Sequence, residues 1–265
     1  MLRQQVLQVC CAALFAPMLA DVMTVQLQRH TVDAYTAYLR AADERVQRQM
    51  REGPFLWVDA SPERKRQVLA GKIIAEPYGE HGETPVPDGL IHDWIGAAFI
   101  PGTTVAKTLA LVQDYNHHKE IYTPEEIESR LISRKGLDFH IYMRVLKKQV
   151  LTVVLDTEHD VHYGKVSDKE WYSRSRTTRV AEVEKPGESN EHVLPPGTGH
   201  GFMWRLDTFW RFAERDGGVY IECEAISLTR DVPTGLGWII NPIIRSLPRE
   251  SLTNTLRQTK AALTR

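Results

Sequence analysis

The sequence predicts an α+β fold, in which a run of antiparallel strands is followed by a long C-terminal helix. The first observation is a period of two near the end of the chain, where the large apolar residues of one parity are Phe202, Trp204, Leu206, Trp210 and Phe212. This period predicts a strand with one buried face. The second is a change after Pro233, where apolar residues recur every three or four positions, as in an amphipathic helix.

A β-hairpin is expected across Asp216, Gly217 and Gly218. These residues tolerate the positive φ angles of a tight turn. Beyond them the alternation resumes, with one parity formed by Val219, Ile221, Cys223 and Ala225 and the other by Tyr220, Glu222 and Glu224. Two alternating runs on either side of such a turn indicate a pair of antiparallel strands.

The last helix is expected on both sides of Pro248. The positions with helical spacing before it are Leu236, Ile240, Ile243, Ile244 and Leu247, and those after it are Leu252, Leu256 and Leu263. An apolar stripe of this kind faces a core, so the helix should lie along the sheet to which the hairpin belongs.

Further strands are expected from Ile127 to Glu184. Between 137 and 145 one parity is apolar, with Leu137, Phe139, Ile141, Met143 and Val145, and the other is formed by Asp138, His140, Tyr142 and Arg144. We therefore expect an antiparallel meander with one buried face and one wet face.

The region before the main strands is expected to have two parts. Residues 1–20 combine Arg3 with an apolar stretch, which is typical of a secretory signal peptide, so the mature chain would begin near Asp21 in the periplasm or outside the cell. The alternative is a buried or interfacial helix of a cytoplasmic protein. Residues 21–85 are expected to form a mostly solvated helical extension and a linker, because residues 79–89 are rich in glycine and proline. The main domain would span residues 86–265.

Residues 173–184, 201–231 and 233–252 resemble the START and SRPBCC superfamily, which includes coenzyme Q-binding and polyketide cyclase groups. Within it they are similar to a bacterial group of START-like proteins. The resemblance implies the helix-grip fold, a curved antiparallel sheet wrapped around a long C-terminal helix. It also implies a deep apolar cavity between sheet and helix that holds a lipid or another hydrophobic small molecule. It does not imply one chemistry, because different functions share this kind of fold.

Composition argues against several other partners. Lys and Arg number 33 and Asp and Glu number 34, so there is no overall positive field for nucleic acid, and only a local patch could make a transient membrane contact. The three cysteines are an adjacent pair within residues 1–20 and Cys223, which does not suit a disulfide framework or a zinc site. The closest histidines are His117 with His118 and His159 with His162, and neither spacing suits a metal. No metal and no cofactor are expected.

The predicted ligand cavity is formed by apolar and aromatic residues of the strands and the last helix. These are Phe139, Ile141, Trp204, Leu206, Trp210, Phe212, Ile221, Cys223, Ile240 and Ile244. The rings of Trp204 and Trp210 would either line a cavity or fill a core. The resemblance favours a cavity.

Arginines on the strand that follows residue 170 are the sharpest polar feature. Because this strand has no clear apolar parity, we expect Arg174 or Arg176 to point inward, and a buried guanidinium needs an anionic partner. One alternative is a protein carboxylate such as Glu222 or Glu224. The other is the acidic head group of a ligand whose tail contacts the tryptophans.

These observations favour a protein that binds, and carries, a hydrophobic small molecule or lipid. A second class is a cyclase or dehydratase that uses the same cavity, for which the nearby acids and bases are His140, Tyr142, Asp207 and Glu224. Their parity places most of them on the wet face, away from a bound substrate, so no catalytic residue is assigned. A third class is a structural or interaction module with a filled core.

Overall fold

The computed structural model describes residues 24–79, 81–148, 152–231 and 237–264, and the side chains of the last helix from Leu247 onwards. The predicted leader, residues 1–20, lies outside this range. The elements in chain order are β1 (Val25–Gln26), α2 (Arg29–Glu52), the 3₁₀ helix η1 (Trp57–Ala60), α3 (Pro62–Leu69), β2 (Ile74–Pro77), β3 (Glu83–Val86), β4 (Gly89–Pro101), α4 (Val105–Val112), α5 (His118–Ile121), β5 (Glu126–Lys135), β6 (Asp138–Lys148), β7 (Thr152–Lys165), β8 (Glu170–Glu184), β9 (His192–Val193), β10 (Thr198–Gly199), β11 (Arg205–Arg215), β12 (Gly218–Arg230) and α6 (Gly237–Leu263).

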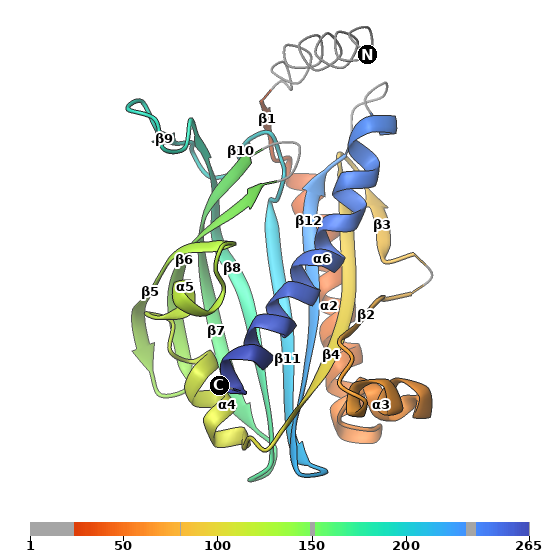
Figure 1. Cartoon of the computed structure of the whole chain (residues 1–265). Coiled ribbons are helices and arrows are strands. Elements are labelled where there is room, and N and C mark those ends of the chain that lie inside the picture. The colour runs from red at the N-terminus through yellow and green to blue at the C-terminus, as the bar shows by residue number, and fades with distance from the viewer. Residues whose placement is uncertain (1–23, 80, 149–151, 232–236, 265) are drawn as a thin grey trace, which may run out of the picture.

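Ten strands of the described chain form one antiparallel sheet. Its order is β2-β4-β12-β11-β8-β7-β6-β5, with β3 also paired to β4 and β9 to β8. The predicted hairpin of β11 and β12 forms, with Asp216 and Gly217 in its turn and Arg215 paired with Gly218. Figure 1 shows α6 in front of this sheet and α2 behind it. The predicted α+β fold, an antiparallel sheet with a long helix at its C-terminal end and a helix before it, is confirmed.

The face of the sheet that packs against α6 is called the inner face below. Its apolar cluster is formed by Ala98, Ile100, Phe139, Ile141, Val161, Tyr163, Phe212, Val219, Ile221 and Cys223 of the sheet, by residues of α4, and by Leu252 and Leu256 of α6. Gly96 of β4 allows close approach, because a Cβ at this position would stand 2.8 Å from Leu256 Cδ1 and 2.9 Å from the Ile74 carbonyl oxygen. The last helix therefore lies directly on the backbone of β4.

The opposite face, called the outer face, packs against α2. The helix contributes Tyr35, Leu39, Ala42 and Val46, and the sheet side contributes Ile91, Trp204, Phe209, Ile226 and Leu228. The Tyr35 hydroxyl fixes the helix on the hairpin by donating to Asp207 Oδ2 and to the Ile226 carbonyl oxygen, both at 2.8 Å. Most other residues of α2 are half-buried or exposed, as predicted. The hairpin is nevertheless buried on both faces.

The segment from η1 to β3 is built onto the same sheet. Strands β2 and β3 both pair with β4, and β3 occupies part of the stretch predicted as a linker. Pro85 is compatible with β3 because this strand pairs along one side only. A third apolar cluster joins this segment to the sheet and contains Leu56, Val58, Val68, Ile74, Ala97, Phe99, Ala213 and Tyr220. Among the described helices, none is long and apolar enough to span a membrane.

Candidate functional site

Most of the residues predicted to form a ligand cavity lie together on the inner face. Phe139, Ile141, Phe212, Ile221 and Cys223 are buried members of the cluster under α6, and Trp210 packs against its edge. Leu206 is half-buried and belongs to the same parity of β11 as Trp210. That these side chains enclose a ligand remains a prediction.

Trp204 and the two isoleucines of the last helix differ from the rest of the predicted cavity set. Trp204 lies on the outer face, where it packs with the α2 cluster, so its assignment to the same face as Trp210 is wrong. The reason is that β11 begins at Arg205, and alternation cannot be extended to a residue before the strand. Ile240 and Ile244 belong to the part of α6 whose side chains lie outside the described residues.

A polar strip interrupts the inner face at β7 and β8. Ser175 lies opposite Val161, and His159 lies two residues from Val161 on the same parity of β7. His159 is 2% exposed, and its Nδ1 lies 3.4 Å from Ser175 Oγ. Its Nε2 is buried without a hydrogen-bond partner within the described part of the chain. The strip thus offers one unused polar atom on an otherwise apolar wall.

Burial determines the charge of this histidine. Loss of solvation, together with a smaller effect of the nearby His140, lowers the pKa of His159 from its ordinary value of 6.5 to about 4. At neutral pH His159 is therefore an uncharged imidazole, which carries one N–H donor and one nitrogen acceptor. It can meet a hydroxyl or a carbonyl group without an accompanying charge. In the sequence His159 stands out only as a possible metal ligand, although it shares its parity with Val161 and Tyr163.

Three partly buried tryptophans border the apolar cluster of the inner face. They are Trp94 of β4, Trp171 of β8 and Trp210 of β11. The ring of Trp210 stacks on Phe212 with 5.9 Å between centroids. The indole Nε1 of Trp94 is buried and has no partner among the described residues. Buried indole N–H groups usually find a partner, so this edge offers a second unused polar atom.

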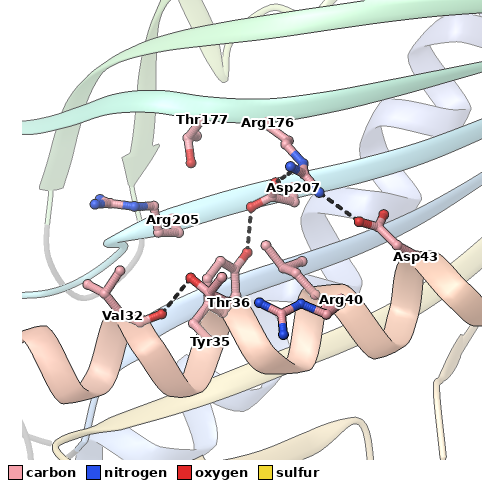
Figure 2. A pocket seen from close by; sticks show the side chains of 10 residues that line it. Val32, Tyr35, Thr36, Arg40, Asp43, Arg176, Thr177, Arg205 and Asp207 are labelled. Carbon is pink, nitrogen blue, oxygen red and sulfur yellow. Dashed lines mark hydrogen bonds and ion pairs between the residues drawn. The ribbon is translucent and has the colours of Figure 1, made fainter.

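The arginines of β8 lie on the outer face. Arg174 is paired across the sheet with Phe209 and Arg176 with Asp207, and both outer-face neighbours lie beneath α2. Arg176 Nη2 donates to Asp43 Oδ2 of α2 at 2.7 Å (Figure 2). Arg174 Nη2 donates to the same oxygen. The hypothesis that Arg174 or Arg176 meets a ligand head group beside Trp210 is therefore wrong, because these side chains are on the other side of the sheet.

These arginines do pair with a protein carboxylate, but the partner is Asp43 and not Glu222 or Glu224. Glu224 accepts two hydrogen bonds from Arg45 of α2, at 2.5 and 3.0 Å. Glu222 lies 3.6 Å from Arg211 Nη1 and accepts the backbone N–H of Trp57 and of Val58 at 2.8 Å each. Both glutamates attach N-terminal segments to the outer face.

The acids and bases considered for catalysis are also occupied on the outer face. His140 lies 2.8 Å from Asp160, Tyr142 donates to Asp156 at 2.8 Å, Asp207 accepts from Tyr35, and Glu224 is held by Arg45. Burial raises the pKa of Asp207 to about 6. None of the four faces α6. Within the described residues no group of three histidine, cysteine or acidic side chains could hold a metal ion.

A pocket of about 360 Å³ lies between α2 and the strands β8 and β11 on the outer face, and it is called the α2 pocket below. Its lining residues are Val32, Tyr35, Thr36, Leu39, Arg40, Asp43, Arg176, Thr177, Arg205 and Asp207. Figure 2 shows these side chains arriving from the helix on one side and from the two strands on the other. No local pattern in the sequence indicates this pocket.

No family model and no curated protein matches this sequence. Among solved structures, a STAR-related lipid transfer protein fragment from Xanthomonas axonopodis aligns at 14% identity and a TM-score of 0.47, over 69% of this chain and 99% of that chain. The Zhui aromatase/cyclase from Streptomyces sp. R1128 aligns at 9% and 0.42, over 66% and 94%. A START superfamily protein from Mycobacterium smegmatis aligns at 8% and 0.40, over 66% and 97%.

The described strands of the main sheet are antiparallel, and the last helix lies across them (Figure 1). At these identities the likeness concerns the fold alone. What the chain binds or does has to be argued from the residues of its own site.

Proposed function

We propose that this protein binds a hydrophobic small molecule or lipid between the inner face of the sheet and α6. The observation that carries the proposal is that the Nε2 of His159 is buried beside apolar and aromatic side chains and has no partner within the described residues. Ligand sites are typically apolar surfaces with a few polar groups that fix orientation. Burial of the ligand would supply about 25 cal/mol per Å² of apolar surface removed from water.

The charge states of these residues favour a ligand whose polar group is uncharged. His159 is uncharged at neutral pH, and both Arg174 and Arg176 are engaged with Asp43 on the outer face. An uncharged imidazole forms a hydrogen bond with a hydroxyl or carbonyl, whereas a buried carboxylate needs a cation or several donors. We therefore expect a long-chain alcohol to bind more tightly than a fatty acid of similar length.

Two measurements test the proposal on the full chain. Solvent extraction of the purified protein followed by mass spectrometry should release a hydrophobic molecule. Titration with farnesol and with palmitate should show saturable binding, tighter for farnesol. His159→Leu should weaken farnesol binding about tenfold, which corresponds to the loss of one well-placed hydrogen bond, and should leave palmitate binding nearly unchanged.

The matched control is His162→Leu, because His162 lies on the same strand but is exposed and paired with Asp138. It should not change either affinity. If neither molecule binds and nothing is extracted, the inner face is a filled core and the structural-module alternative takes its place. If His159→Leu lowers the melting temperature while farnesol binding persists unchanged, His159 has a structural role.

A cyclase or dehydratase is the second candidate, and His159 is also the observation that favours it. A buried neutral imidazole can accept a proton from a bound substrate. Loss of water from a medium-chain β-hydroxy ketone, followed by the absorbance of the conjugated product, would test this activity. The reaction should disappear in His159→Gln and persist in His162→Gln. If both variants and the unmodified protein give the same rate as buffer, the protein acts by binding alone.

Export is a further part of the proposed function, since carriage of an apolar molecule is useful between two membranes. The support is the apolar leader with Arg3 near its start. Expression of the full chain in a bacterium and measurement of its intact mass would test it. A product that begins near Asp21 is expected, and an uncleaved product in the cytoplasm would contradict export.

A further inference from the structure

The α2 pocket is separate from the proposed ligand site, because the sheet lies between them. Its lining comes from α2, β8 and β11 on the outer face, whereas α6 covers the inner face (Figure 1). Val32 and Leu39 give the pocket an apolar part, and Tyr35 lies beneath it with its hydroxyl already donated to Asp207. Its volume of about 360 Å³ suits a small organic molecule.

The charges around the α2 pocket do not cancel. Asp43 is shared by Arg174 and Arg176, and Asp207 lies 3.9 Å from Arg176 Nε. Arg40 and Arg205 also line the pocket, and within the described part of the chain neither forms an ion pair with a carboxylate. Three guanidinium groups line the pocket, and Arg174 reaches Asp43 from beside it, so four guanidinium groups are set against two carboxylates, an excess of two positive charges. Tyr35 and the apolar residues contribute no charge.

The position of these arginines distinguishes them from ordinary surface charges. Arg40 comes from α2, Arg176 from β8 and Arg205 from β11, and Figure 2 shows the three among the side chains that line the pocket. A guanidinium group presents a planar fork of donors that matches the oxygens of a phosphate or carboxylate. Arg205 Nη1 donates to the Trp204 carbonyl oxygen at 2.7 Å, which does not balance its charge. Two guanidinium groups without a carboxylate partner match a group with two negative charges better than a group with one.

We propose that the α2 pocket binds the phosphate group of a phosphomonoester, with Arg40 and Arg205 as its principal contacts. A phosphomonoester carries a charge of about −1.5 to −2 at pH 7, which balances the excess charge of the pocket. The organic part of the ester contacts Val32 and Leu39. The phosphate belongs either to a soluble ester or to a phospholipid head group, and these two sources share the same recognition chemistry.

Calorimetric titration of the full chain with inorganic phosphate and with phenyl phosphate, at fixed ionic strength, tests this proposal. Both probes should bind saturably with one site, and phenyl phosphate should bind more tightly because its ring reaches the apolar part. Arg40→Gln and Arg205→Gln should each weaken phenyl phosphate binding about tenfold, as expected for the loss of a charged hydrogen bond. Neither substitution leaves a carboxylate unpaired, so the melting temperature should stay the same.

The matched control is Arg48→Gln, because Arg48 is an exposed arginine of the same helix that does not line the pocket. The Arg48→Gln variant should bind inorganic phosphate and phenyl phosphate with the affinities of the unmodified protein. Absence of saturable binding, or equal weakening in Arg48→Gln, would overturn the proposal. Farnesol affinity should be unchanged in all three variants, which separates this result from any failure of the inner-face site.

Vesicles distinguish the two sources of the phosphate. Cosedimentation with phosphatidic acid vesicles, but not with phosphatidylcholine vesicles, would assign a phospholipid head group if phenyl phosphate displaces the protein and Arg40→Gln abolishes the binding. Saturable binding of phenyl phosphate without cosedimentation would assign a soluble ester. Cosedimentation that is insensitive to phenyl phosphate and to Arg40→Gln would count against the pocket as the lipid contact.

Discussion

Replacement of Arg45 by methionine should show how strongly α2 is held on the outer face. Arg45 donates to Glu224 through two nitrogens and lies 3.7 Å from Asp93 Oδ2. The two carboxylates are 0% and 1% exposed. Burial and the nearby Glu224 raise the pKa of Asp93 well above its ordinary value, so Asp93 is largely protonated at neutral pH. Arg45 then balances one buried charge, that of Glu224.

The expected loss can be worked out from the fate of that charge. Without Arg45, the Glu224 carboxylate must stay charged in the interior or take up a proton. For a glutamate with an ordinary pKa of about 4.3, protonation at pH 7 costs about 3.7 kcal/mol, and at pH 5 it costs about 1 kcal/mol. Breaking a buried ion pair by removal of one partner typically costs about 3 to 5 kcal/mol. We expect Arg45→Met to lose about 3 to 4 kcal/mol of unfolding free energy at pH 7.

The sign of the pH dependence follows from the same step. The folded variant holds a proton that its unfolded state releases above about pH 4.3, so the stability of the variant falls as the pH rises. Urea unfolding of both proteins at pH 5 and pH 7 measures this difference. Arg45→Met combined with Glu224→Gln should recover most of the loss, and Arg48→Met serves as the exposed control. A loss of less than about 1 kcal/mol at pH 7, or one of the same size at both pH values, would refute this account.

Two further substitutions test other contacts. Burial raises the pKa of Glu126 from 4.5 to about 8 and lowers that of the adjacent His118 from 6.5 to about 4. Below pH 6.5 the two residues change the stability in opposite directions as the pH rises, and above pH 6.5 only Glu126 changes it. Because of Glu126, the unfolding free energy should fall by about 2 kcal/mol between pH 6.5 and pH 8. Urea unfolding of Glu126→Gln should show no such fall, and an equal fall in both proteins would contradict this assignment. Gly96→Ala places a methyl group 2.8 Å from Leu256 Cδ1 and should cost about 1 to 3 kcal/mol, measured by thermal unfolding. An unchanged melting temperature would mean that α6 can move away from β4 at no cost.

Much of the fold could be predicted because its signals are local. Alternation along β11 and β12 depends only on neighbouring residues, and the turn between them needs positive φ, which Asp216 and Gly217 adopt at 56° and 78°. The helical spacing of Leu252 and Leu256 likewise indicates one buried stripe. Phe212 and Ile221 were therefore assigned to the face that α6 covers, and they lie there.

The site could be predicted only in part, because burial patterns do not say which helix covers which face. Parity places His159 with the buried Val161 and separates it from the exposed His162, but it does not say which helix covers the buried parity. The assignment of Trp204 failed for a related reason, since it lies just before β11. The position of His159 on the inner face follows only from the pairing of β7 with β6 and β8.

The sequence by itself determined the long strands, the hairpin turn and the amphipathic helices, because each depends on the spacing of residues within a few positions. The tertiary structure decided how the two faces are used. Arg174 and Asp43 are 131 residues apart, and they meet because α2 crosses the outer face. The α2 pocket has the same origin, since its arginines come from three separate elements. Charges that distant in sequence leave no local pattern, and only the packing of the helix on the sheet brings them together.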